Sequence, residues 1–131
     1  MVILDHASIV TPELERAVDF YVRYLNLHTF RIEDDPIRRG KRRAMLKDAR
    51  GREVLEIIEL PELAHPSIPG RGGLHHLGFR LTRKHWQELR NKLEEEHYPY
   101  QEKAGRLFLR DADGLLLEIE YATSPEELEV A

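Results

Sequence analysis

Cysteine is absent from the 131-residue sequence. This absence excludes disulfide bonds, thiolate metal ligands and a cysteine nucleophile, and it fits a protein of a reducing compartment. Asparagine and glutamine are also scarce, with two of each, whereas 34% of the residues are charged. A charged composition with few amide side chains is typical of heat-adapted proteins, so we expect a thermophilic source.

A long apolar run is missing as well. The amino-terminal residues 1–6 lack the basic and apolar segments of a signal peptide, and no stretch approaches the roughly 20 apolar residues of a membrane span. We therefore expect a cytoplasmic protein that contacts no membrane. A basic excess is missing too, and the net charge of −4 argues against nucleic-acid binding. The length predicts a single domain, residues 1–131, with its own hydrophobic core.

The chain instead shows one order of secondary structure twice. In the first half, alternating side chains predict a strand at 3–10, and a helix follows it. Three further strands are predicted, at 28–33, 42–47 and 53–60. Turn residues separate them, at Asp35-Pro36, Arg39-Gly40 and Arg50-Gly51. The predicted order of the first module is therefore βαβββ.

The second half repeats this order after a linker. Residues 61–73 hold three prolines and three glycines, which indicates a connection rather than a regular element. Beyond it, the pattern predicts a strand at 74–81, a helix from Thr82 to about 97, and strands at 98–102, 106–110 and 115–121. Residues 111–114 predict the hairpin turn before the last strand. We therefore expect an α+β fold of two tandem βαβββ modules, 1–60 and 74–122, with an acidic tail at 123–131.

The two helices carry clear sequence signals. Thr11 and Pro12 are typical of an N-cap and a first helical residue, and Asn26 can close the first helix. Between them, apolar residues at helical spacing predict one buried stripe, formed by Leu14, Ala17, Val18, Tyr21 and Leu25. The second helix has a corresponding stripe, formed by Trp86, Leu89 and Leu93.

Four polar residues occupy matching positions in the two modules. His6 matches His76 in the first strand of its module, and Glu56 matches Glu118 in the last. Both carboxylates stand among apolar residues, where an unpaired carboxylate costs several kcal/mol or takes up a proton. We therefore expect each carboxylate to have a partner, and a divalent cation would serve as one.

The two halves resemble the vicinal oxygen chelate superfamily, which includes glyoxalase I, bleomycin-resistance proteins, fosfomycin-resistance transferases and extradiol dioxygenases. Five segments carry the resemblance, namely 5–10, 16–21, 55–57, 75–79 and 113–118. In glyoxalase-like members, a His or Gln from the first and fifth strands and a Glu from the fourth and eighth strands bind the metal. The resemblance therefore implies four metal ligands, His6, Glu56, His76 and Glu118.

The resemblance also implies a function. Two imidazoles and two carboxylates without sulfur suit Ni, Zn, Mn, Fe or Co, with water in the remaining positions. In glyoxalase-like members a small substrate chelates the cation through two neighbouring oxygens, and the cation stabilises the enolate or oxyanion that develops. Glu118 or Glu56, released from the cation, would then act as the general base. We expect isomerase or lyase chemistry in a metal cleft surrounded by a curved mixed sheet.

Three other functions stay open at this point. An extradiol-type dioxygenase would use two histidines and one glutamate as ligands. A drug- or metabolite-binding resistance protein would have no catalysis, and a structural domain would carry the four polar residues by coincidence.

Small members of the superfamily often form homodimers, so the ligands would come from one chain or from two. The sequence leaves the substrate and the metal undefined.

Several further residues are weaker candidates. His75 is expected on the strand face opposite His76, in a supporting or structural role. Arg80 and Arg110 are possible substrate anchors, and His65 in the linker is a possible gate. The basic residues between 38 and 43 predict a solvated hairpin or, alternatively, an anion-binding rim. Three large aromatic residues are expected in the core or an interface, namely Trp86, Tyr98 and Tyr100.

Overall fold

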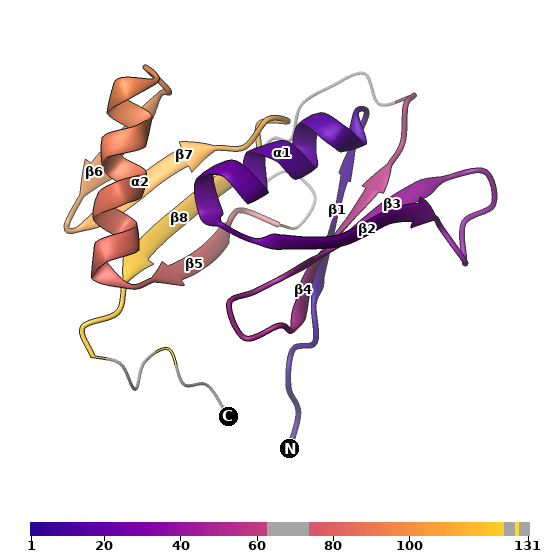
Figure 1. Ribbon diagram of the computed structural model, residues 1–131, viewed down its shortest axis with the longest axis horizontal. Helices are drawn as coiled ribbons and strands as arrows, with labels where there is room; N and C mark the ends of the chain where they lie inside the picture. Colours follow the sequence, from indigo (N-terminus) through magenta and orange to yellow (C-terminus); the bar gives the residue numbers. More distant parts are fainter. Residues whose placement is uncertain (63–73, 125–127, 129–131) are drawn as a thin grey trace. The chain divides into compact units, whose positions relative to one another are not determined.

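The computed structural model describes residues 1–62, 74–124 and 128. The chain divides into two compact units, Met1–His65 and Pro66–Ala131. The described part of each unit contains four strands and one helix in the order βαβββ, which can be followed along the colours of Figure 1. The predicted tandem arrangement is therefore confirmed. Most of the predicted linker, with His65, and most of the predicted tail lie outside the described residues.

Both units have the same sheet topology. The elements of the first unit are β1 (Ala7–Thr11), α1 (Leu14–Leu25), β2 (His28–Asp34), β3 (Arg42–Lys47) and β4 (Glu53–Glu59). Those of the second unit are β5 (Leu77–Leu81), α2 (Arg83–Glu95), β6 (Tyr100–Lys103), β7 (Arg106–Arg110) and β8 (Leu116–Tyr121). The strand orders are β1-β4-β3-β2 and β5-β8-β7-β6. In each sheet the first strand pairs parallel with the last, and the other pairs are antiparallel.

The parallel register places equivalent residues side by side in the two units. Ser8 is the Cα partner of Glu56 in the first unit, and Gly78 is the partner of Glu118 in the second. Because side chains alternate along a strand, each glutamate projects from the same face of its sheet as its partner. The neighbours of each glutamate along its strand project from the other face, toward the helix.

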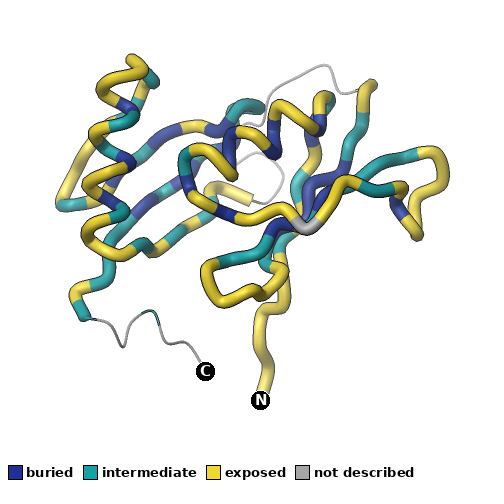
Figure 2. The backbone as a smooth tube through the Cα atoms, in the orientation of Figure 1, coloured by how far each residue is buried: buried dark blue, intermediate teal, exposed yellow. Residues whose placement is uncertain are grey.

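The buried positions follow this alternation. In Figure 2 they run along the strands and along one side of each helix. Fully buried strand residues include Leu46, Leu55 and Ile57 in the first unit and Leu107, Leu117 and Ile119 in the second. Burial of one such side chain contributes about 1.5–3 kcal/mol, so each unit has a core of its own between sheet and helix.

Helix α1 buries its predicted stripe but begins later than predicted. The buried residues include Leu14, Ala17, Val18, Tyr21 and Leu25, and the helix packs against β3 and β4. The assignment of Thr11 and Pro12 as N-cap and first helical residue is wrong, because Thr11 ends β1 and pairs with Glu59. Glu13 takes the cap position without a side-chain cap. A carboxylate oxygen of Glu59 instead accepts the hydrogen bond from the Leu14 backbone N–H at 3.0 Å.

Helix α2 starts where the sequence predicts. The Thr82 hydroxyl accepts a hydrogen bond from the backbone N–H of His85 at 3.1 Å, as an N-cap does. The predicted stripe is buried, namely Trp86, Leu89 and Leu93. The helix packs against β5 and β8, and the indole N–H of Trp86 donates to the Ile119 carbonyl at 3.2 Å. Trp86 therefore lies in the core, as expected.

The first strand of each unit is shorter than predicted. β1 begins at Ala7 rather than at residue 3, because its pairing with β4 begins opposite Leu55. Ile3 and Leu4 precede the pairing and are exposed. β5 likewise begins at Leu77 rather than at residue 74. Side-chain alternation thus extends in the sequence beyond the residues that have a partner strand.

The turns agree with the sequence, except after α2. Asn26 closes α1 with a left-handed φ of 53°. The predicted turn glycines have positive φ, a region that glycine enters without strain: Gly40, Gly51 and Gly114. Helix α2 ends at Glu95 instead of about residue 97, and His97 has a φ of 55°. The next strand, β6, therefore begins at Tyr100 instead of residue 98.

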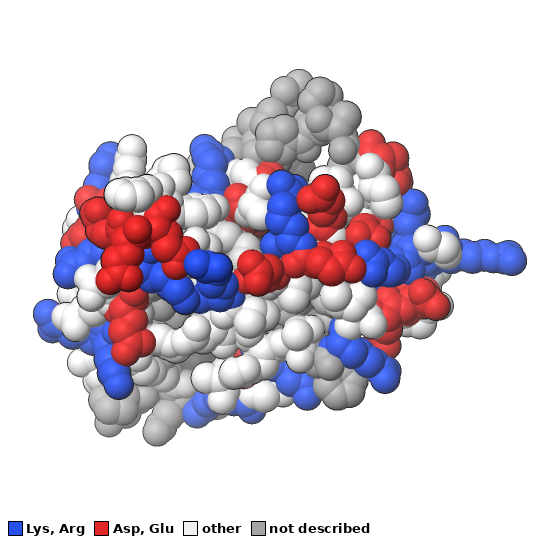
Figure 3. All heavy atoms as spheres, turned by 45° about the horizontal axis from the view of Figure 1, so that its top comes forward, with Lys and Arg blue, Asp and Glu red and all other residues white. Residues whose placement is uncertain are grey.

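Charged side chains of both signs are mixed at the surface. On the face that Figure 3 shows, acidic and basic side chains lie next to one another and form no single basic patch. Ion pairs connect many of them, which suits the high content of charged residues in the sequence. Neither helix in residues 1–62, 74–124 and 128 has the length and apolarity needed to cross a membrane.

Candidate metal site

His76 and Glu118 of the second unit are in contact. His76 directly precedes β5, Glu118 lies in β8, and Nε2 of His76 is 3.0 Å from Oε2 of Glu118. The parallel pairing of β5 with β8 explains this contact, since Gly78, two residues after His76, is the Cα partner of Glu118. The structure therefore brings together the two residues that the sequence singled out in this unit.

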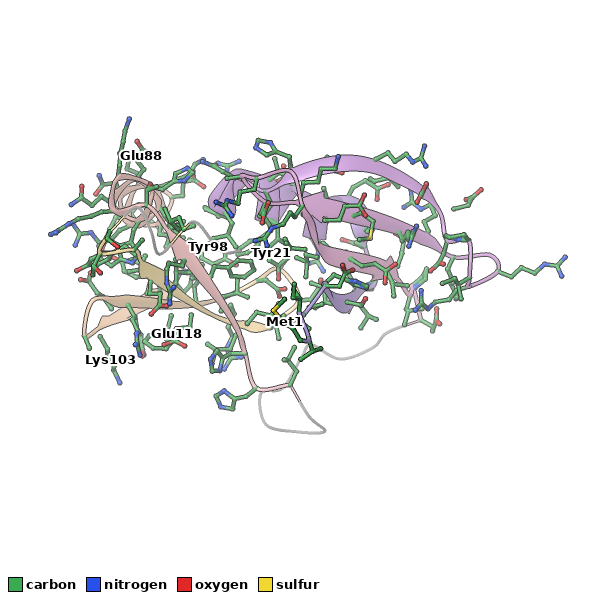
Figure 4. All side chains as sticks on the ribbon, turned by 90° about the horizontal axis from the view of Figure 1, so that it is seen from below. Met1, Tyr21, Glu88, Tyr98, Lys103 and Glu118 are labelled. Carbon is green, nitrogen blue, oxygen red and sulfur yellow. The ribbon has the colours of Figure 1, made fainter. Side chains whose placement is uncertain are left out.

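The space beside this pair is open. A Cβ placed on Gly78 would meet no atom within 4 Å beyond its chain neighbours. The side chains of His76 and Glu118 are 39% and 21% exposed. Figure 4 shows the labelled Glu118 on the side of its sheet opposite α2. An ion or small molecule can therefore approach the imidazole and the carboxylate without entering the core.

Two more side chains hold this pair in place. Nη1 of Arg106 lies 3.2 Å from Oε1 of Glu118, so each carboxylate oxygen has its own partner. The Nδ1 atoms of His75 and His76 are 3.0 Å apart, and the rings meet edge to face. The expectation that His75 points to the opposite face is wrong, because residues 74–76 precede β5 and do not alternate as a strand does.

Glu56 of the first unit has different partners. Its side chain is 6% exposed, and it accepts hydrogen bonds from the Ser8 hydroxyl at 2.7 Å and from Nη1 of Arg43 at 2.8 Å. Burial raises the pKa of Glu56, but the hydrogen bonds from Ser8 and Arg43 outweigh it, so the pKa lies below its ordinary value. Glu56 is therefore ionised at neutral pH, and both of its oxygens are engaged.

His6 occupies the same place before β1 that His76 occupies before β5. Its Nδ1 lies 2.8 Å from a carboxylate oxygen of Asp5, and its side chain is 39% exposed. A carboxylate on one ring nitrogen orients the other nitrogen toward a metal ion in many metal sites. His6 therefore presents Nε2 as the nitrogen suited to a ligand role.

Each unit thus offers one imidazole and one carboxylate. Within either unit, the described residues contain no group of three or more His, Asp or Glu side chains placed to hold a metal ion. The donor types suit a divalent transition metal, since they combine nitrogen and oxygen without sulfur. His76 and Glu118 fit this role by exchanging their mutual contact for the cation. Glu56 fits it only by exchanging a hydrogen bond from Arg43 or Ser8 for the cation.

The two arginines predicted as substrate anchors have partners within the second unit. Arg80 donates to a carboxylate oxygen of Glu120 from Nε at 3.1 Å and from Nη2 at 2.7 Å. Nη1 of Arg110 donates to the carbonyl of Gly114 at 2.8 Å, inside the β7–β8 hairpin. These contacts give both arginines a role in the fold.

The basic residues between 38 and 43 divide into two groups. Arg38 is exposed and pairs with the buried Asp35 at 2.8 Å. Burial raises the pKa of Asp35, but Arg38 and two backbone N–H groups outweigh it and lower the pKa to about 2. Arg42 lies in β3 and binds both Glu15 and Glu59. The hairpin interpretation therefore applies to residues 38–41, which precede β3, and not to Arg42, which links α1 with β4.

Sequence reasoning missed three residues that contact the candidate ligands, namely Ser8, Arg43 and Arg106. Alternation along residues 3–10 puts Ser8 on the same face as His6, which was a usable signal. Arg43 precedes Glu56 by 13 residues and Arg106 precedes Glu118 by 12, so an alignment of the two halves pairs the arginines only with a one-residue gap. Neither signal shows which carboxylate an arginine reaches, because that depends on the antiparallel register.

Comparison with known proteins identifies the family. The model of the Glyoxalase/Bleomycin resistance protein/Dioxygenase superfamily matches residues 3–119. Among curated proteins, none matches the chain. A solved glyoxylase/bleomycin resistance protein/dioxygenase domain from Frankia sp. EAN1pec has 20% identity and a TM-score of 0.77, over 93% of this chain and 98% of that chain.

Two further solved structures share the fold. A trypanothione-dependent glyoxalase I from Leishmania major has 19% identity and a TM-score of 0.75, over 98% of this chain and 93% of that chain. The fosfomycin resistance protein FosX from Listeria monocytogenes, complexed with Mn(II) and sulfate, has 15% identity and a TM-score of 0.69, over 98% of both chains. Together with the match over residues 3–119, the duplicated topology shows that the chain belongs to the Glyoxalase/Bleomycin resistance protein/Dioxygenase superfamily.

Proposed function

We propose that the protein is a metal-dependent glyoxalase-like enzyme whose cation is held by His6, Glu56, His76 and Glu118. The observation that carries this proposal is the contact of an imidazole and a carboxylate at 3.0 Å beside a glycine that leaves the approach open. The first unit supplies the equivalent pair by position. Each unit supplies two of the four residues, so the proposed set draws on both units, from one chain or from two copies.

The proposed reaction is a proton transfer of the isomerase or lyase type on a small substrate. When bound, the cation would chelate neighbouring oxygens of the substrate and stabilise the negative charge that develops on them. Glu118 and Glu56 are the two candidates for the general base. The side chain of Glu118 is 21% exposed and that of Glu56 only 6%, so substrate reaches Glu118 more readily.

Two of the similar structures support this class of function. The Leishmania protein is a glyoxalase I, and the Listeria protein is complexed with Mn(II). Membership of the same superfamily supports a divalent metal cofactor here, with Mn²⁺ as the first ion to test.

The contact between Glu56 and Arg43 favours a second candidate, an extradiol-type dioxygenase. If Glu56 stays with Arg43, the remaining ligands are two histidines and one carboxylate, His6, His76 and Glu118. Two histidines with one carboxylate form the ligand set of non-haem Fe(II) oxygenases. This candidate requires Fe(II) and oxygen, whereas the proton-transfer enzyme requires neither.

Metal content and three assays separate the candidates. The purified protein is assayed for bound metal and then supplied with hemithioacetals, with epimerisable acyl thioesters, and with catechols under air. Turnover of either of the first two substrates supports the proton-transfer enzyme, and ring cleavage of a catechol with Fe(II) supports the dioxygenase. Metal-free protein that binds small aromatic compounds without turnover would contradict both and favour a drug- or metabolite-binding protein.

We also propose that the working form is a homodimer. Small members of the superfamily often form homodimers, and a dimer would allow the two halves of the four-ligand set to come from different chains. Sedimentation at several protein concentrations measures the stoichiometry. A monomer with full activity and bound metal would contradict this part of the proposal.

A further inference from the structure

Glu56 and Glu118 each have an arginine partner at an equivalent position. Arg43 stands in β3 two residues before the Cα partner of Glu56, and Arg106 stands in β7 two residues before the partner of Glu118. Both arginines reach diagonally across the antiparallel ladder to the glutamate, where diagonal neighbours lie within reach of long side chains. The Nη1-to-carboxylate distances are 2.8 Å in the first unit and 3.2 Å in the second.

The two ion pairs differ in burial. The side chains of Arg43 and Glu56 are 21% and 6% exposed, whereas those of Arg106 and Glu118 are 51% and 21% exposed. Arg43 is also anchored from its other side, because Nε and Nη2 donate to Glu33 at 3.1 and 3.0 Å. Water screens the exposed pair and weakens it, whereas separating the buried pair leaves a charge without a partner.

The residue beside each glutamate adds to the difference. Ser8 donates its hydroxyl to the second oxygen of Glu56 at 2.7 Å, while Gly78 has no side chain to offer Glu118. The second oxygen of Glu118 instead faces Nε2 of His76. Donors from its own sheet therefore bind both oxygens of Glu56, whereas one oxygen of Glu118 faces a candidate metal ligand.

We propose that Arg43 competes with the metal ion for Glu56, so that Glu56 exchanges between the cation of the four-ligand set and its contacts with Arg43 and Ser8, whereas the more exposed Arg106 competes less for Glu118. This inference rests on the proposed function, since it concerns the same metal site. Arg43 is then a positioning residue that orients the Glu56 carboxylate. A cation gains Glu56 as a ligand only by replacing the Arg43 contact, and the cost of this exchange lowers the affinity of the four-ligand set.

Calorimetric titration with MnCl2 tests the competition on the full-length protein. Arg43→Gln should bind Mn²⁺ roughly tenfold more tightly than the wild type, a change that corresponds to about 1.4 kcal/mol. Arg42→Gln is the control, because Arg42 lies next to Arg43 in β3 and pairs with Glu15 and Glu59 instead of a candidate ligand, and it should change the affinity by less than roughly threefold. Arg43→Lys keeps the charge and should restore an affinity near that of the wild type.

One further variant and a second measurement keep the test decisive. Because loss of a buried ion-pair partner can unfold a protein, Ser8→Ala provides a milder release of Glu56 and should raise the Mn²⁺ affinity by a smaller factor. In the Co²⁺-loaded protein, Arg43→Gln should change the visible absorption spectrum as Glu56 joins the metal, because the spectrum follows the coordination geometry. Arg43→Lys should leave the spectrum unchanged.

The outcomes distinguish this inference from the proposed function. Suppose that the wild type binds Mn²⁺ and that neither Arg43→Gln nor Ser8→Ala binds it more tightly. This result would overturn the competition but would not contradict the proposed metal enzyme. Absence of Mn²⁺ binding in the wild type and in both variants would overturn both. Binding that appears only after Arg43→Gln would support the competition, with Arg43 as the group that blocks the site.

Discussion

Nε2 of His76 lies 3.0 Å from the carboxylate of Glu118 because the parallel pairing of β5 with β8 sets the two side by side. The first unit pairs β1 with β4 in the same way, yet there the equivalent carboxylate is bound by a serine and an arginine of its own sheet. One topology, repeated, therefore presents two carboxylates with different partners. Equivalent substitutions in the two units should have different effects.

Replacing Glu118 by Gln should remove bound metal. The substitution keeps the size of the side chain but removes its charge. Mutation of a residue that only supports a metal ligand already lowers metal affinity by about 10–100-fold. We therefore expect loss of the ligand itself to lower the Mn²⁺ affinity at least about 100-fold. Glu120→Gln is the matched control, because Glu120 lies two residues further along β8 and binds Arg80 and Arg106. Elemental measurement of bound metal compares the two, and equal loss from both would contradict the role of Glu118.

Replacing Gly78 by Ala should slightly stabilise the fold. A Cβ at this position meets no atom within 4 Å, and alanine is favoured over glycine within a strand by about 0.5–1 kcal/mol. Gly51→Ala is the control, since Gly51 has a φ of 78° and a side chain there costs about 1–2 kcal/mol. Urea denaturation measures both free energies of unfolding. Destabilisation by Gly78→Ala would mean that the space beside Glu118 is filled.

Asp35 should make the stability of the protein depend on pH in the acid range. Its pKa is lowered from 3.8 to about 2, because the bonds from Arg38 and two backbone N–H groups outweigh the effect of burial. A carboxyl group whose pKa is lower in the folded protein than in the unfolded chain stabilises the fold fully at pH values above the unfolded-chain pKa. This contribution is lost as the pH falls through the pKa of the folded protein. The contribution should therefore be complete above about pH 4 to 5 and disappear near pH 2.

The variant Asp35→Asn tests this dependence. At pH 7 it should be less stable than the wild type by about 2 kcal/mol, and the difference should shrink as the pH approaches 2. Asp34→Asn, at the exposed neighbouring position, should stay within about 0.5 kcal/mol of the wild type. Urea denaturation at a series of pH values follows all three proteins. A difference for Asp35→Asn that does not change with pH would refute the ionic contribution.

Replacing Glu59 by Ala should loosen the start of α1. Its carboxylate accepts the N–H of Leu14 at 3.0 Å and binds Arg42, so its loss leaves an unpaired donor at the helix start. Loss of a helix cap costs about 0.5–2 kcal/mol, and the value here should lie in the upper part of this range because Arg42 loses a partner as well. Glu62→Ala is the control, since Glu62 is exposed and pairs with Lys41 at 3.3 Å. Thermal unfolding followed by circular dichroism should show a lower midpoint for Glu59→Ala alone.

Local signals predicted the regular elements well. The bounds of β3 and β7 agree with the sequence at both ends, and the predicted apolar stripe of α1 is buried. The beginnings of β1 and β5 were predicted too early, because side-chain alternation starts before the first paired residues, Ala7 opposite Leu55 and Leu77 opposite Leu117. The start of α1 was also misplaced, since Thr11 is bound in the β1–β4 ladder and a glutamate from β4 serves the helix.

The sequence by itself determined the duplicated βαβββ order and the four candidate ligands, because periodicity, turn residues and internal repetition are properties of the chain. Only the tertiary structure decided that Glu118 faces His76 while Glu56 faces Arg43 and Ser8. Each of these contacts joins residues from different elements of one sheet. The pairing register and the length of the side chain set such contacts, and neither the spacing nor the composition of the sequence records that register.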